Sequence, residues 1–577
     1  MQPGSLWLWD DNNLHKHQNL LDGSLIFYAV TCANSPVTDS ILTPQSPAPP
    51  DYYQNIFCSV FEFVLTRFAG IAADSLISDL QSYLDASSDA QRLFARLLTR
   101  KGPTFLTASL KYAEITQLEQ AISELGDLKL LQLSGSVPAD QLLTLLTKAQ
   151  IVDYFSVPKI QAKTSKGHIL DALLSSQSDL QICQRCQKQT AWITITAPQQ
   201  WRLISTLYFG NAGQDWSTFV RRDLGLLAYE SVALHAQQFA TRNAMEEHLE
   251  ERVYSSLVYR LDELPHLANA LLDKLTQTAT VALGLPSRQR LRQRSLLRLG
   301  KWAEKEKLLG IALSAYEHTN IPPARERQIR ILSKEKRLEE ANSLIAAIKK
   351  SPISATERLF TERFGKRGGG YQPPTTVIEI QETPESVEDF VLQQLIEEGG
   401  WGIHSENLML KTLTGLIYWP ICFAPLPGAF TNLFQAGPHD LFETDFFLQR
   451  QLAIENLEAS LALEADFIAH ITEIARKKQG IANRLVSWGL LESVTIDEWL
   501  TAIPFKQLQQ LSQFLIRNLS EYRRGFPDLF ICYESGHVEY VEVKGPSDQL
   551  QPQQRAWFEE FKRMNVPARV VKLLVRK

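Results

Sequence analysis

The stretch of sequence that decides the fold runs from Gly525 to Leu550 and reads GFPDLFICYESGHVEYVEVKGPSDQL. Two runs rich in β-branched and aromatic residues, 529–533 and 538–543, flank Glu534-Ser535-Gly536. This pattern predicts a β-hairpin with a three-residue loop, in which Gly536 takes the left-handed conformation.

The register of this hairpin decides which side chains share a face. With a three-residue loop, Tyr533 lies opposite His537, and counting back places Asp528 opposite Glu542. Lys544 shares the face of Glu542 because side chains alternate along a strand. A two-residue loop would send Asp528 to the other face. The three-residue loop therefore predicts two carboxylates and a lysine side by side.

Two carboxylates beside a lysine indicate a site for a hard cation. Carboxylate oxygens suit Mg²⁺ or Mn²⁺, and such an ion can polarise a phosphodiester and lower the pKa of an attacking water. Lys544 could position that water or stabilise charge that develops on the phosphate. The spacing of Pro527-Asp528 and Glu542-x-Lys544 is the PD-(D/E)xK pattern of nucleases. The alternative is an exposed hairpin with an ordinary charge pair.

The neighbouring segments favour the nuclease interpretation. The segment 551–564, QPQQRAWFEEFKRM, predicts a helix, in which Trp557 belongs to the core and Gln554 orients Lys544 or contacts DNA. A last strand is expected at 569–575. Upstream, IHSENLMLKTLTGLIYW (403–419) predicts an apolar helix with Glu406 at its start, which would supply a third carboxylate.

The N-terminal half is predicted to be helical. A Pro-rich stretch at 43–51 follows an N-terminal segment, and helices of a winged-helix-like domain should occupy 52–138, one of them stopped by Gly102-Pro103. Residues 139–176 predict a helix, the basic loop KTSKGH and a second helix. This order resembles the DNA-binding SAP module; a plain surface hairpin of helices is the alternative.

The middle of the chain predicts stacked helical pairs. Segments such as LLRLGKWAEKEKLLGIALS and ILSKEKRLEEANSLIAAIKK within 225–365 indicate a tandem array, with Gly310 and Ala341 where helices would pack closely. The run KRGGGYQPPTT (366–376) should end it as a linker. A last domain is expected over 377–577, and the connection 177–224 is assigned to the SAP-like module, which then spans 139–224.

Composition excludes several classes of protein. The chain has 577 residues, 44% of them hydrophobic, and lacks both a membrane-length apolar run and a signal peptide, so we expect a cytoplasmic protein. Six cysteines are too few for a disulfide framework; the Cys183/Cys186 pair indicates reduced thiols rather than zinc ligands, because no second pair of ligands follows.

Charge is unevenly distributed. The net charge is -5, yet residues 288–337 hold 14 Lys and Arg against 5 Glu, a local net of +9. A chain that is acidic overall with basic islands can bind a polyanion locally. Outside 288–337, the residues that we expect to contact DNA are Arg100, Lys101, Lys163 and Lys166.

Together these motifs resemble the Fanconi-associated nuclease family and its VRR-NUC domain. The resemblance spans residue 52 to the end and rests on the segments GFPDLF, VEVKGPSDQL and QxxW, on the Glu406 helix, and on RLLTRKGP (96–103), LYFGNAGQDWSTFVRRDLG (207–225) and FQAGPHDLFETDFF (434–447). It implies a multidomain, mostly α protein: helical N-terminal and SAP-like modules, TPR-like helical repeats, and a C-terminal α/β PD-(D/E)xK nuclease core.

The resemblance also implies an activity and a site. The family is metal-dependent, acts on 5′ flaps as an endonuclease and 5′-to-3′ exonuclease of the phosphodiesterase I type, and processes interstrand crosslinks. By position, Glu406, Asp528, Glu542 and the Val543 carbonyl would bind the metal, with Lys544 catalytic. Arg325, Arg327 and Arg330 are candidates for its basic 5′-phosphate pocket; a solvated helix face is the alternative.

One departure from the family concerns recruitment. The ubiquitin-binding zinc finger of eukaryotic members has no counterpart in the Cys and His spacing, so a bacterial-type member is expected, nucleoid-associated when bound to DNA. A non-catalytic scaffold that binds DNA structures and a protein-interaction platform built on the repeats remain competing hypotheses.

Overall fold

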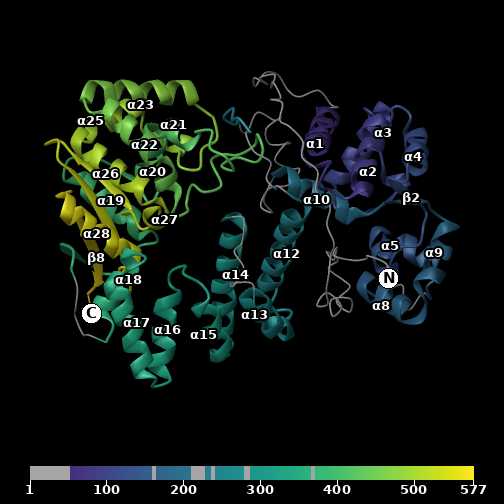
Figure 1. The fold of residues 1–577 in the computed structure, drawn as a ribbon, viewed down its shortest axis with the longest axis horizontal. Coiled ribbons are helices and arrows are strands. Elements are labelled where there is room, and N and C mark those ends of the chain that lie inside the picture. The colour runs from purple at the N-terminus through teal and green to yellow at the C-terminus, as the bar shows by residue number, and fades with distance from the viewer. Residues whose placement is uncertain are drawn as a thin grey trace. The chain divides into compact units, whose positions relative to one another are not determined.

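A computed structural model describes residues 52–158, 164–209, 228–234, 239, 241–277, 286–365 and 371–576. The predicted N-terminal segment, its Pro-rich linker, Lys163 and most of the 207–225 motif lie outside these ranges. The chain divides into two compact units, one ending at Ala228 and one beginning at Tyr229 (Figure 1). Across the described part of the chain, we find no helix with the length and apolarity needed to span a bilayer.

The first unit begins with a bundle of helices around aromatic side chains. α1 (Tyr52–Phe68), α2 (Asp74–Asp85), α3 (Ser88–Thr99) and α10 (Pro198–Phe209) bury a cluster in which Phe94 and Trp201 meet edge to face, with ring centroids 4.7 Å apart. α3 ends before Gly102-Pro103, as predicted. α1, α2 and α3 lie within the predicted helical domain at 52–138, whereas α10 comes from the segment 177–224 that we assigned to the SAP-like module.

A small sheet adjoins the bundle and α4 (Leu118–Asp127). Its strands β1 (Thr104–Leu106), β2 (Leu131–Leu133) and β3 (Trp192–Ile195) have the order β1-β3-β2. The central strand β3 thus comes from beyond the boundary that we placed at residue 138. The helices between β2 and β3 are an insertion into this sheet.

The inserted helices differ in detail from the predicted pair. They are α5 (Ala139–Leu145), α6 (Lys148–Tyr154), α8 (Lys166–Ser176) and α9 (Asp179–Gln187). The first predicted helix is broken because Thr147 caps α6 in a capping box. Lys166 begins α8 rather than lying in a loop, and its Nζ donates to the Thr144 carbonyl at 2.9 Å. Cys186 is buried on α9, and burial raises its pKa to about 11.

The second unit opens with paired helices. These are α12 (Arg242–Tyr259), α13 (Ala268–Gln277), α14 (Pro286–Lys305), α15 (Leu309–Glu317), α16 (Ala324–Lys334), α17 (Leu338–Lys350) and α18 (Ala355–Arg363). The segments KEKLLGIA (305–312) and KEKRLEEA (334–341) make the same turn, with left-handed Lys307 and Lys336 at φ 62° and 64°. The repeated sequence therefore repeats the helix-ending turn.

Close packing in this array occurs at a different glycine from the one we predicted. A Cβ on Gly310 would meet nothing within 4 Å, whereas a Cβ on Gly300 would lie 2.5 Å from the Tyr316 ring. Gly310 is therefore not a packing position. Ala341 is buried, as expected.

This difference gives a paired test of stability. Gly300→Ala should cost about 1–3 kcal/mol because the Tyr316 ring must move. Gly310 is exposed on α15, so Gly310→Ala should raise the free energy of unfolding by about 0.5–1 kcal/mol. Urea unfolding of both variants measures these changes; equal effects would contradict the packing described.

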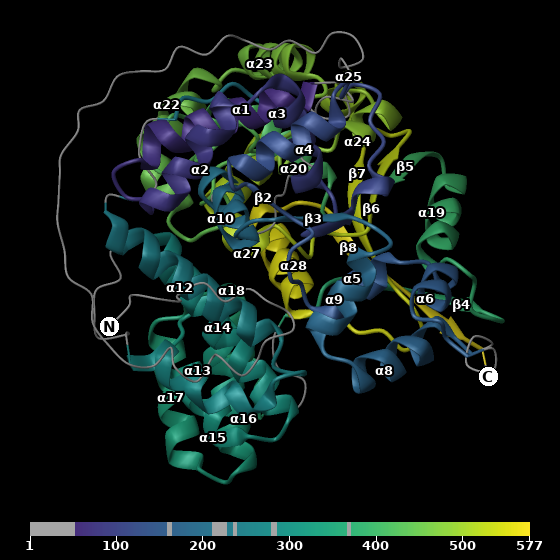
Figure 2. The same cartoon turned by 90° about the vertical axis from the view of Figure 1, so that its right-hand side faces the viewer.

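The C-terminal part is built on a five-stranded mixed sheet. Its strands are β4 (Thr375–Ile380), β5 (Gly400–His404), β6 (Leu529–Tyr533), β7 (Val538–Lys544) and β8 (Ala568–Val575), in the order β4-β8-β7-β6-β5. β4, β8 and β7 run parallel, and β6 is antiparallel to β7 and β5. Figure 2 shows β6, β7 and β8 side by side in this sheet.

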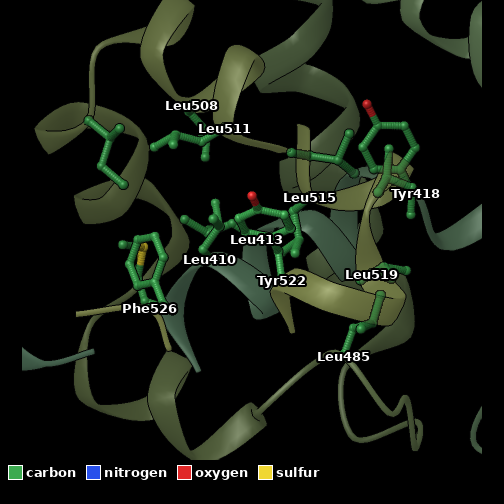
Figure 3. Close-up of a cluster of buried hydrophobic side chains, with 14 of the residues drawn as sticks. Leu410, Leu413, Tyr418, Leu485, Leu508, Leu511, Leu515, Leu519, Tyr522 and Phe526 are labelled. Carbon is green, nitrogen blue, oxygen red and sulfur yellow. The ribbon is translucent and has the colours of Figure 1, made fainter. Parts of the chain in front are cut away.

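Helices cover both faces of this sheet. α19 (Val387–Glu397) packs with Val541 and Val543 on one face. The opposite face, which includes Tyr540, packs against α20 (Met409–Ile417), α26 (Phe505–Arg517) and α28 (Pro552–Met564). Figure 3 shows leucines of α20 and α26 meeting in this core. The remaining helices are α21 (Trp419–Cys422), α22 (Phe446–Ser460), α23 (Glu464–Lys478), α24 (Trp488–Ser493), α25 (Ile496–Ala502) and α27 (Leu519–Tyr522).

The last repeat helix, α18, is packed into this core. Leu359 is buried in the same cluster as the sheet residues, and Arg358 forms an ion pair with Glu559 of α28 at 2.7 Å. Glu521 accepts hydrogen bonds from the backbone N–H groups of Ala355 and Thr356. The predicted linker at 366–376 therefore does not mark a break in packing, and β4 begins within it.

Candidate active site

The hairpin has the predicted register. Tyr533 N donates to the His537 carbonyl at 2.9 Å, and Gly536 has φ 76°, so the loop has three residues. Leu529 pairs with Val541, which places Asp528 opposite Glu542. The Asp528 Oδ2 accepts from Val543 N at 2.8 Å. This bond holds the first carboxylate against the neighbouring strand.

Glu542 is the most deeply buried acid of the site. Its side chain is fully buried, its Oε1 lies 2.6 Å from Lys544 Nζ, and its Oε2 is buried with no hydrogen-bond partner in the described structure. Burial raises the pKa of Glu542 to about 8, and the charge of Asp528 adds to this while Lys544 opposes it. One oxygen of this acid thus receives no hydrogen bond from a donor in the protein core and lies in a carboxyl beside that of Asp528, an arrangement that is costly without a cation or a shared proton.

Gln554 positions Glu542 rather than Lys544. Its Nε2 donates to Glu542 Oε1, while its Oε1 accepts from Gln551 N at 2.8 Å in a capping box. The start of α28 therefore fixes the direction of the amide. Trp557, one turn further along, is 1% exposed and belongs to the core, as expected.

Glu406 does not begin a helix. It lies in the turn between β5 and α20, and α20 starts only at Met409. Ser405 N and Glu406 N both donate to the Asp528 carbonyl, at 2.7 and 3.2 Å, and Asn407 is left-handed with φ 51°. The Asn407 amide donates to Glu406 Oε1 at 3.0 Å. The turn thus ties Glu406 to the residue that begins the hairpin.

The donor set suits a divalent cation. In the described ranges, no three His, Cys, Asp or Glu side chains are grouped so that they could hold an ion. One oxygen of Glu542 contacts Lys544 and Gln554, and one oxygen of Asp528 accepts from Val543 N. The bare Glu542 Oε2 and the all-oxygen chemistry fit a hard cation.

Sequence analysis missed several cations beside the site. Burial lowers the pKa of Lys411, and Arg524 and Arg523 lower it further. The charge of Glu406, a predicted metal ligand, opposes this shift. Arg523 and Arg484 both lie over the Phe442 ring, at 4.8 and 4.5 Å.

Further cations of this set come from α14. Arg294 of α14 forms an ion pair with Glu443, and Arg290 lies 3.9 Å from Asp445. We call this set the basic tract: Lys411, Arg523, Arg524, Arg484, Arg294 and Arg290. Arg290 and Arg294 lie within the basic segment 288–337, and Arg523 and Arg524 directly precede GFPD, an adjacency that could have revealed them.

The motif at 434–447 supports this tract. Asp440 and Arg450 form a buried ion pair at 2.6 Å. His439 N donates to the Ala429 carbonyl, and burial lowers the pKa of His439 to about 4. These contacts fix the loop that presents Phe442 and Glu443.

The predicted DNA-binding residues of the repeats are engaged elsewhere. Arg325 pairs with Glu357 at 2.5 Å, Arg327 with Glu304 at 3.2 Å and Arg330 with Glu326 at 2.8 Å. In the first unit, Arg100 donates to the Tyr112 hydroxyl at 2.9 Å and Lys101 is exposed. Arg325, with 18% of its side chain exposed, is the least available to DNA.

A mixed sheet whose hairpin brings together the buried Glu542, the half-buried Asp528 and a lysine defines a nuclease of the PD-(D/E)xK class. Comparisons with known proteins agree. The model of the VRR-NUC domain matches residues 464–573, and the model of the "FAN1, HTH domain" matches residues 51–132.

Relatives match most of the chain. It is 28% identical to the Fanconi-associated nuclease 1 homolog of Pseudomonas aeruginosa, over 92% of this chain and 97% of that protein. It is 26% identical to the Fanconi-associated nuclease 1 homolog of Arabidopsis thaliana, over 89% of this chain and 66% of that protein. The crystal structure of paFAN1 bound to 2nt 5′ flap DNA with gap superimposes with a TM-score of 0.82, at 26% identity, over 92% of this chain and 100% of that one. Over most of its length the chain is therefore similar to Fanconi-associated nucleases, and its C-terminal part matches the VRR-NUC domain.

Proposed function

We propose that this protein is a structure-specific DNA nuclease that hydrolyses phosphodiesters near 5′ flaps. The observation that carries the proposal is Glu542, fully buried beside Asp528 and Lys544 with one oxygen left without a partner. A core does not retain such a group for stability. The similar paFAN1 was crystallised with 5′ flap DNA, which supports the same substrate class here.

We assign roles to the site residues as follows. Glu406, Asp528 and Glu542, with the Val543 carbonyl, would hold the cation, which supplies charge stabilisation and a more acidic water. Lys544 would orient the attacking water or the scissile phosphate. Gln554 holds Glu542 in place through its amide. Burial raises the pKa of Glu542, so its carboxyl would have to give up any proton it holds when the ion binds.

The basic tract is the best candidate for phosphate contacts near the site. One of its cations, Lys411, feels the charge of Glu406, and the tract would hold DNA without reading its sequence. Arg100, Lys101, Lys163 and Lys166 remain proposals for duplex contacts in the first unit. Arg325, Arg327 and Arg330 are weaker proposals because each already has a glutamate partner.

We infer Mg²⁺ or Mn²⁺ as the working ion. Both should support cleavage, whereas Ca²⁺ should permit DNA binding with little cleavage because its longer, looser coordination positions water poorly. Excess chelator should abolish cleavage. Flap cleavage measured with each ion tests this; full activity in chelator would refute it.

Finer features follow from the same proposal. We infer activity of the phosphodiesterase I type, 5′-to-3′ exonuclease action, a part in interstrand crosslink repair, and a place in the bacterial cytoplasm on the nucleoid. The helices at 139–187 would be a SAP-like module, and α12 to α18 TPR-like repeats. Cleavage of labelled flap, nicked and single-stranded DNAs side by side is the direct test. Equal rates on all three would reject structure specificity.

A further inference from the structure

One face of α14 holds a row of five cations. The residues are Arg290, Arg294, Arg298, Lys301 and Lys305, at spacings of four, four, three and four. At about 100° per residue all five lie within about 80° of one another, and they span about 22 Å of helix. We call this row the α14 ridge. Its first two members belong to the basic tract.

Charge on the ridge is balanced at its ends but not in its middle. Arg294 pairs with Glu443 and Lys305 lies 3.1 Å from Asp262. Arg298 and Lys301 have no carboxylate partner among the residues that the structure describes. Burial lowers the pKa of Lys301, and Arg327 and Arg298 lower it further. Neighbouring cations that repel one another without a counter-charge favour a polyanionic ligand.

An exposed aromatic ring adjoins this unbalanced pair. Tyr259, the last residue of α12, is 65% exposed, and the Arg298 guanidinium lies 3.3 Å from its ring centroid. α12 and α14 pack against each other (Figures 1 and 2). Surfaces that bind single-stranded nucleic acid combine a basic track with an aromatic ring on which a base can stack. A duplex held by its phosphates needs no such ring.

We propose that the α14 ridge binds the single strand of a 5′ flap where it leaves the basic tract, with a base stacked on Tyr259. The ridge begins at Arg290 and Arg294, which pair with Asp445 and Glu443 of the motif 434–447. From there it continues along α14, away from that motif. A flap of one nucleotide would end before the middle of the ridge, and a longer flap would cover it. This inference rests on the proposed function and deepens it.

The test compares flap length in the full chain. Affinity for a one-nucleotide and an about ten-nucleotide 5′ flap is measured by fluorescence anisotropy in Ca²⁺ at several salt concentrations. The double variant Arg298→Gln/Lys301→Gln should lose about tenfold affinity for the long flap, and its salt slope should fall by about 1.4, since each single-strand phosphate contributes about 0.7. Tyr259→Ala should lower the affinity for the long flap about fivefold, and Tyr259→Phe should leave that affinity almost unchanged. Binding of the one-nucleotide flap should not change.

A control removes the same charge elsewhere. Lys349→Gln/Lys350→Gln neutralises two exposed lysines at the end of α17 and should leave both flaps unaffected. The inference would be overturned if this control lost as much affinity for the long flap as Arg298→Gln/Lys301→Gln. It would also be overturned if Arg298→Gln/Lys301→Gln lost equal affinity for both flaps, or lost no affinity for the long one. A wild-type chain that binds neither flap better than plain duplex would instead overturn the proposed function itself.

Discussion

Replacing Glu542 by glutamine should abolish flap cleavage while the fold and most of the flap affinity remain. The variant removes a charge that the metal requires, so cleavage should fall by at least about a thousandfold. The melting temperature should stay the same or rise, because the variant removes a buried carboxylate charge that lies beside the charge of Asp528. Single-turnover cleavage, anisotropy and thermal unfolding measure the three quantities.

A matched control lies on the neighbouring helix. Glu560 is also a buried acid with a raised pKa, caused by burial, and its partner is Arg563 rather than a site residue. Glu560→Gln should cleave normally. Asp528→Ala and Lys544→Ala should behave like Glu542→Gln. Full cleavage by Glu542→Gln, or a loss of binding in parallel with cleavage, would contradict the assigned role.

A chain that begins at residue 377 should not fold cooperatively, whereas one that begins at 352 should. The shorter chain lacks α18 and therefore the burial of Leu359 and the ion pair between Arg358 and Glu559. It also lacks Thr375 and Thr376 of β4. Together these losses should lower the free energy of unfolding by at least about 3–5 kcal/mol. Urea unfolding of both chains measures the difference.

A point variant separates packing from chain length. Leu359→Ala in the full chain should cost about 2–5 kcal/mol, while cleavage at saturating metal should remain because Leu359 is not a site residue. Equal unfolding midpoints for the two truncated chains would show that the boundary near residue 377, drawn from the Gly- and Pro-rich run, is also the physical one.

The part of the site that the sequence by itself determined is the hairpin. A strand has a side-chain period of two and its loop has three residues, so the relation of Asp528 to Glu542 and Lys544 follows from local geometry alone. The end of α3 before Gly102-Pro103 and the burial of Trp557 were predictable for the same reason. Each follows from the pattern of residues along one continuous segment of the chain.

Only the tertiary structure decided how distant residues meet. Glu406 stands in a turn because the Asp528 carbonyl, over a hundred residues away, accepts from its N–H. The basic tract combines residues of α14, α20 and the segment before β6, while Arg325 is paired with Glu357. The partner of a charge depends on which surfaces pack together, and local periodicity does not specify that packing. Gly300 rather than Gly310 is the close-packed glycine for the same reason: its neighbour, Tyr316, comes from another helix.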